Sequence, residues 1–242
     1  MDMGKDKMKE EKLLLSDQIR EQLDEKGIRY WSNDNISEVL NDEDREGLID
    51  ELTEKFEGVL DSLLIDRKND PNAMDTGRRM AKMYINEIMG GRYTPPPKVT
   101  AFPNDDPDTR YQGMIVTRAE IRSICSHHHQ PVAGVAYIGL LPGVKVIGLS
   151  KYARVAQHVA RRGTLQEELT QNICDEIQKH TGAKDIAVYI QGTHGCCENR
   201  GIMAHSSLTQ TTELRGQFFN PSVKNEFLDY IKMQQQFAGT RT

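Results

Sequence analysis

The sequence lacks the features of a secreted or membrane-spanning protein. Apolar residues make up 37% of its 242 residues, and no apolar run approaches the roughly 18 residues that a membrane-spanning helix needs. Residues 1–12 are mostly charged and contain no apolar core of the kind a signal peptide has. We therefore expect a cytoplasmic protein, in which the four cysteines are thiols or metal ligands rather than disulfides.

The chain also lacks an excess of positive charge. Its formal net charge is −5, which argues against binding nucleic acid over a broad surface. We expect neither a nucleic acid nor a membrane as partner. A local cationic pocket for a small phosphorylated ligand is still compatible with this charge.

The pattern of apolar residues divides the chain into four segments. Residues 1–40 read as a charged N-terminal extension, either a solvated helix or a flexible arm. Residues 41–91 form a helical part, with helices over 41–64 and 78–89 and the second ended by Gly90-Gly91. Residues 92–112 contain five prolines and read as a linker. Residues 113–242 read as a catalytic domain.

This last segment has the order strand, strand, helix, helix, strand, strand. Ser150 is a plausible N-cap for the first helix, Thr164 with Glu167 fits a capping box for the second, and Gly182 fits its end. The ββααββ order predicts an α+β fold, an antiparallel sheet with helices on one face. The strands are expected over 114–124, 132–141, 186–190 and 204–214, and the helices over 150–161, 164–179 and, closing the chain, 226–234.

Cysteine and histidine gather in two clusters about seventy residues apart. Cys125 and His128 follow a predicted strand, and Cys196 follows another. Thiolate and imidazole ligands from separate strands suit a zinc ion in a pocket with an open position. Cys197 competes with Cys196, but neighbouring strand residues face opposite sides, so only one should face the metal. The ordinary alternative is a buried cysteine beside surface histidines.

Other polar residues near these clusters suggest proton transfer and anion binding. His127 and His194 could exchange protons at neutral pH, or support the metal ligands. Lys151 and Arg154 lie in the first turn of the helix expected from Ser150, where cations do not help the helix itself. With Arg200 they could bind phosphates, or be ordinary solvated charges. Gln166-Glu167-Glu168 is either an acidic helix start or a carboxylate site for the edge of guanine.

Five ordered motifs resemble the GTP cyclohydrolase I family, over roughly residues 45–235. The helix at 74–88 is also similar to the family's N-terminal helix. The motifs are Cys125-Ser-His127-His128, Gly148-Leu-Ser150-Lys151-Tyr-Ala-Arg154, Gln166-Glu167-Glu-Leu-Thr170, Thr193-His194-Gly-Cys196 and Arg200-Gly201.

The resemblance implies a zinc enzyme with the tunnelling fold. It would open the imidazole ring of GTP at C8, release formate and form 7,8-dihydroneopterin triphosphate. The family assembles as a homodecamer with active sites at subunit interfaces. The resemblance implies that zinc is bound by Cys125, His128 and Cys196, and that protons are transferred by His127 and His194. It implies that guanine is bound by Glu167 with the backbone near Gln166. The triphosphate would be bound by Ser150, Lys151, Arg154, Arg200 and a neighbouring subunit's Arg79.

The chain departs from the family pattern close to the expected pocket. Ser126 stands where the family has Glu, His129 where it has Leu, and Glu168 where it has Arg. Two alternatives therefore stay open. One is a divergent enzyme that uses another purine nucleotide or stops at a ring-opened intermediate. The other is a catalytically weak nucleotide-binding or regulatory oligomer.

Overall fold

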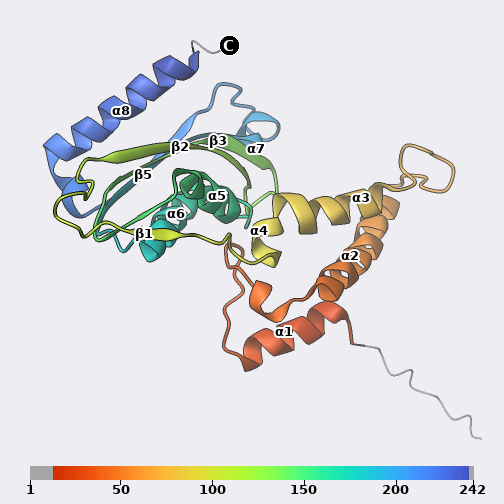
Figure 1. Ribbon diagram of the computed structural model, residues 1–242. Helices are drawn as coiled ribbons and strands as arrows, with labels where there is room; N and C mark the ends of the chain where they lie inside the picture. Colours follow the sequence, from red (N-terminus) through yellow and green to blue (C-terminus); the bar gives the residue numbers. More distant parts are fainter. Residues whose placement is uncertain (1–12, 240–242) are drawn as a thin grey trace, which may run out of the picture.

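The computed structural model describes residues 13–239 and contains a helix-covered sheet with a helical part beside it (Figure 1). The N-terminal helices lie to one side of the sheet, and α8 lies across the sheet from α5 and α6. The elements before the sheet are α1 (Leu15–Glu25), η1 (Ser37–Val39), α2 (Asp42–Ser62), α3 (Thr76–Lys82), the π-helix η2 (Met83–Ile88) and α4 (Gly90–Tyr93).

Helix α2 confirms the first predicted helix. It begins at a capping box, in which Asn41 accepts from the Asp44 backbone and Asp44 accepts from the Asn41 backbone. Helix α1 packs against it, and the Ser16 hydroxyl donates to Glu51 at 2.7 Å. A small apolar cluster of Ile19, Leu23, Ile36 and Val39 joins α1 to the following loop. Residues 15–40 thus take part in a packed apolar cluster that Leu48 and Tyr93 also contact, while residues 1–12 lie outside the described chain.

The second predicted helix is confirmed by α3 and η2, which end at Ile88, just before Gly90-Gly91. These residues begin α4, and Gly91 is needed for a close approach of two backbones. A Cβ at Gly91 would lie 2.0 Å from the carbonyl oxygen of His158. The glycine therefore lets α4 pack directly on α5 (Leu149–Ala160).

The antiparallel sheet confirms the predicted ββααββ order. Its strands run in the spatial order β2-β3-β5-β6, and α5 and α6 connect the two pairs. The strands approach closely at Gly134 of β3, where a Cβ would lie 2.2 Å from the carbonyl oxygen of Gln191 in β5. The elements are β2 (Ile115–Ile124), β3 (Pro131–Leu141), α6 (Gln166–Thr181), β5 (Asp185–His194), α7 (Gly195–Glu198), β6 (Thr209–Arg215), η3 (Gly216–Phe219) and α8 (Pro221–Gly239).

Alternating residues of the strands build two apolar layers. One face carries Ala136, Ile138 and Leu140 of β3, and it packs on α5 and α6. The other face includes Tyr137 of β3 and Ala187 of β5, and it packs on Phe218 and on α8. This two-residue alternation is what buries both faces of an extended chain. Helices α5 and α6 share one face as predicted, and α8 covers the other.

Two helix starts differ from their predicted caps. Helix α5 begins at Leu149 after Gly148, so Ser150 is in its first turn rather than its N-cap. Helix α6 begins at Gln166, and Thr164 donates to Glu168 at 2.6 Å instead of forming a box with Glu167. The predicted C-terminal glycine is confirmed, since Gly182 has a φ of +67°.

The proline-rich segment also contributes a strand. β1 (Ala101–Pro103) pairs antiparallel with β4 (Lys145–Ile147) in a separate two-stranded sheet. Neither strand was predicted. This pair fixes the path of the segment between α4 and β2, whose division into domains stays a prediction.

Candidate active site

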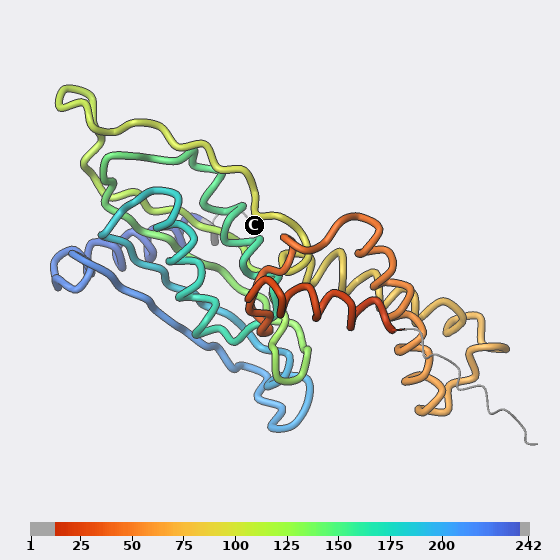
Figure 2. Tube along the Cα trace, turned by 90° about the horizontal axis from the view of Figure 1, so that it is seen from below, coloured from red at the N-terminus to blue at the C-terminus, as the bar shows by residue number. Residues whose placement is uncertain are grey.

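One end of the sheet collects both cysteine and histidine clusters. The loop of residues 125–130 joins β2 to β3 and is closed by backbone hydrogen bonds between Cys125 and Gln130 and between His129 and Cys125, both 2.9 Å. Val132 of β3 pairs with His194 of β5. The end of β5 and α7 therefore lie beside the β2–β3 loop, as Figures 1 and 2 both show.

This register makes Cys125 and Cys196 neighbours. Cys125 is buried and Cys196 is half-buried in α7. Burial, followed by the nearby Cys125 thiol, raises the pKa of Cys196 to about 11. Cys197 lies on the same short helix, its Sγ 4.0 Å from that of Cys196. The Cys196 thiol is therefore protonated near pH 7, and a bound cation would favour its thiolate.

The three consecutive histidines are exposed and face different directions. The rings of His127 and His128 are 6.3 Å apart, edge to face. His129 has a φ of +50°, and its ring contacts Tyr84 of η2 at 5.7 Å. His129 thus turns the hairpin and contacts the helical part. Within residues 13–239 no three His, Cys, Asp or Glu side chains are grouped closely enough to hold a metal, so His128 is not gathered with the two thiols.

Gln166 and His194 of the site are held by a set of hydrogen bonds. The buried Gln166 amide donates to the Thr209 carbonyl and the Thr211 hydroxyl, both at 3.1 Å. Its oxygen is 2.8 Å from His194 Nε2. Because the amide nitrogen faces acceptors, its oxygen accepts, and His194 carries its proton on Nε2. Nδ1 is left as a proton acceptor.

Burial lowers the pKa of His194, against the opposing charges of Glu167 and Glu198. The ring is therefore neutral near pH 7 and able to accept a proton. Glu167 itself is exposed at the start of α6. The two consecutive carboxylates diverge, because Glu167 acts on His194 while Glu168 bonds to Thr164.

The predicted anion-binding residues come from three parts of the fold, which are α5, the segment after α7, and α3. Lys151 donates to the Lys98 carbonyl at 2.8 Å, and the side chains of Ser150, Arg154 and Arg200 are exposed. Arg79 lies on α3 and pairs with Asp75 at 3.6 Å.

A hollow between α4 and α5 brings the predicted anion-binding residue Arg154 together with two further polar residues. Its volume is about 340 Å³, and its lining includes Arg154, His158 and Arg161 from one face of α5. These residues repeat at helical spacing, but nothing in the sequence shows that α4 faces them. Likewise, the threonines that hold Gln166 depend on the pairing of β5 with β6.

Comparison with known proteins gives one consistent family. Residues 52–232 match the family model described as GTP cyclohydrolase I. A protein of Flavobacterium johnsoniae named GTP cyclohydrolase 1 is 36% identical over 89% of this chain and 97% of its own length. One of the same name from Aeromonas salmonicida is 41% identical over 74% of this chain and 84% of its own.

A solved structure, the archaeosine synthase QueF-Like in the apo form, aligns with 44% of this chain at 11% identity. Its TM-score of 0.37 is too low to support a conclusion. Within residues 13–239, each helix is too short or too polar to cross a membrane.

Proposed function

The chain belongs to the GTP cyclohydrolase I family, and on that premise we propose that it is the hydrolase this name describes. It opens the guanine ring of GTP at C8, releases formate and yields 7,8-dihydroneopterin triphosphate. The observation that carries the proposal is the extent of the match, which covers residues 52–232 and includes every candidate site residue.

We propose zinc as the cofactor, held by Cys125, His128 and Cys196. The donor set suits zinc because two thiols lie together and an imidazole is in the same short loop as one of them. His128 must turn toward the thiols to complete the set. Zinc bound there would supply Lewis-acid activation of a water.

The side chains of this chain have separate roles in the proposed reaction. His194 accepts a proton at Nδ1, since Gln166 occupies Nε2, and His127 serves as the second proton-transfer group. Glu167 binds the N1–H and 2-amino edge of guanine, with the backbone near Gln166. The triphosphate is bound by Ser150, Lys151, Arg154 and Arg200.

The place of Arg79 on the helical part supports an assembled enzyme. Helix α3, which carries Arg79, lies to one side of the sheet (Figure 1), and we propose that Arg79 reaches the site of a neighbouring subunit. The assembly is a homo-oligomer, proposed to be a decamer. We also propose a cytoplasmic location, because all four cysteines lie in the described chain as free thiols.

The test is to incubate the zinc-loaded protein with GTP and to follow formate release together with pterin fluorescence. Both signals are expected. Formate without fluorescence would favour an enzyme that stops at a ring-opened intermediate. Tight GTP binding with neither product would favour a regulatory oligomer, and either result overturns the proposal.

The metal assignment has a matched pair of neighbouring variants. Cys196→Ala should lose zinc and Cys197→Ala should keep it, as measured by metal content per subunit after dialysis. One zinc per subunit in Cys196→Ala would contradict the assignment of Cys196.

A further inference from the structure

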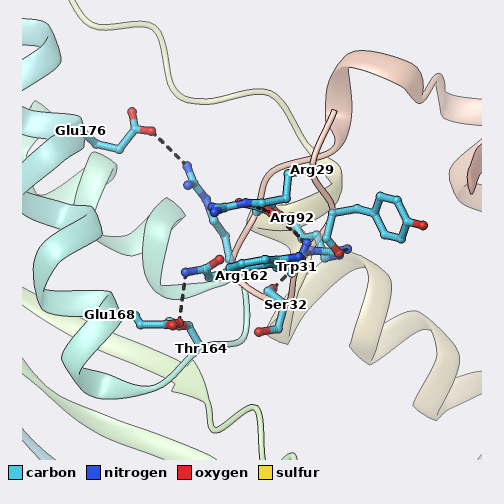
Figure 3. Close-up of polar contacts among 11 residues, drawn as sticks. Arg29, Trp31, Ser32, Arg92, Arg162, Thr164, Glu168 and Glu176 are labelled. Carbon is cyan, nitrogen blue, oxygen red and sulfur yellow. Dashed lines mark hydrogen bonds and ion pairs between the residues drawn. The ribbon is translucent and has the colours of Figure 1, made fainter. Parts of the chain in front are cut away.

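A loop outside the family match lies against the start of α6. Residues 28–34 precede the matched region 52–232, yet Figure 3 shows them beside Thr164 and Glu168. The loop is held in one shape. Arg29 makes two hydrogen bonds to Asp34, at 2.7 and 2.8 Å, and stacks 4.5 Å over the ring of Trp31.

Arg92 of α4 also holds this loop, through hydrogen bonds to its backbone. Its guanidinium donates to the carbonyl oxygens of Tyr30, Trp31, Ser32 and Asp34. A planar group with five N–H donors is suited to hold several acceptors at once. The loop is thus a rigid support attached to α4.

The loop reaches α6 through one carboxylate oxygen. Glu168 Oε2 accepts from the Thr164 hydroxyl at 2.6 Å and from the Asn33 amide at 3.1 Å. The hydrogen bonds and charge of Asp34 raise the pKa of Arg29 most. The negative charge of Glu168 raises it further. Glu168 therefore joins the loop to the first turn of α6 by hydrogen bonds and by charge.

A buried cation lies beside this contact. Arg162 is 7% exposed and pairs with Glu176 at 3.6 Å, and Figure 3 draws both next to the loop. Burial lowers the pKa of Arg162, while the charges of Glu176 and Asp34 oppose that shift. Asp34 of the loop thus contributes negative charge near the buried guanidinium of Arg162.

We infer that Asn33 and Glu168 are positioning residues for nucleotide recognition. Glu168 takes the hydrogen bonds at the helix start, so the adjacent carboxylate of Glu167 is free to face the substrate edge. The rigid loop fixes the direction of that first turn. This inference rests on the proposed function, in which Glu167 binds guanine.

The test is the kinetics of Asn33→Ala. The variant loses an exposed hydrogen bond to a charged group. Its KM for GTP should rise about fivefold, and its kcat should stay within about twofold of wild type. Glu168→Gln keeps an oxygen acceptor but loses the charge, so it should raise KM less than Glu168→Ala, which should resemble Asn33→Ala. The double variant Asn33→Ala/Glu168→Ala should add little to Glu168→Ala.

A second readout separates positioning from a loss of stability. Inosine triphosphate lacks the 2-amino group, so it should compete with GTP better when Glu167 is misdirected. The ratio of its inhibition constant to the KM for GTP should fall about threefold in Asn33→Ala, a fraction of the discrimination that a hydrogen-bonding site supplies. Gln171→Ala, exposed on the same helix, is the control and should leave both values unchanged.

The outcomes distinguish this inference from the proposed function. If Glu167→Gln leaves the KM for GTP unchanged, the nucleotide-binding role of Glu167 is wrong. If Glu167→Gln raises KM but Asn33→Ala does not, only the positioning role is wrong. Equal effects of Asn33→Ala and Gln171→Ala would also overturn it.

Discussion

The contact of Gly91 with α5 gives the sharpest prediction about how the helical part is attached. A Cβ at Gly91 would lie 2.0 Å from the His158 carbonyl oxygen and 3.1 Å from that of Arg161. Both neighbours are backbone, so no side-chain rotation can relieve the clash. To reach a carbon–oxygen contact of about 3.3 Å, α4 and α5 must separate by roughly 1.3 Å.

Gly91→Ala should therefore lower the free energy of unfolding by about 3 kcal/mol, the upper part of the range for overpacking. For a chain of this size this corresponds to roughly 6–12 °C in the melting temperature. Gly58→Ala is the matched control. Gly58 lies within α2 with nothing near its Cβ position, so alanine there should stabilise by about 0.5–1 kcal/mol.

Urea unfolding followed by circular dichroism measures both variants. The fluorescence of Trp31, the only tryptophan, adds a local signal, because Arg92 of α4 holds its loop. Gly91→Ala should change Trp31 emission before unfolding begins, and Gly58→Ala should not. A Gly91→Ala protein with wild-type unfolding and wild-type emission would refute the close approach.

Three further changes test other parts of the structure. Gly139→Ala places a Cβ 2.6 Å from the Phe227 ring and should cost about 1–3 kcal/mol in urea unfolding; an unchanged midpoint would contradict the packing of α8. Gln166→Leu leaves buried acceptors unpaired and should cost about 2 kcal/mol, with the His194 proton resonances shifted in NMR spectra. Burial lowers the pKa of His158 below 6.5, so the unfolded chain binds the proton more readily and stability should fall as pH drops below about 6.5. His158→Gln should flatten this fall between pH 7.5 and 5.5, and an unaltered slope would refute it.

The sheet was predictable because its signals are local. β-Branched runs at 114–124 and 132–141 and the glycine at 182 each determine their own conformation. β1 and β4 were missed because each has three residues and gains its structure only from the other. The close approach at Gly91 was likewise invisible, since a Gly-Gly pair in a sequence indicates a helix end as readily as a helix contact.

The candidate site was predictable in its residue types and less so in its geometry. Cys125 and Cys196 are neighbours because β3 pairs with β5 in one register, which no local pattern encodes. Thr164 bonds to Glu168 rather than pairing with Glu167, although both carboxylates fit the acidic start of a helix. The direction of His128 depends on the loop conformation and on a metal, and the spacing of residues determines neither.

The hydrogen bonds from Arg92 to four carbonyl oxygens have a consequence for local unfolding. A loop held by separate bonds can fray one residue at a time, but the carbonyl groups of Tyr30, Trp31, Ser32 and Asp34 share a single guanidinium. Moving Arg92 releases all of them together, and with them the Asn33 contact to α6. Amide hydrogen exchange in this loop, in α4 and in the first turn of α6 should therefore share one opening free energy, so that these three separate stretches of chain behave as one cooperative unit.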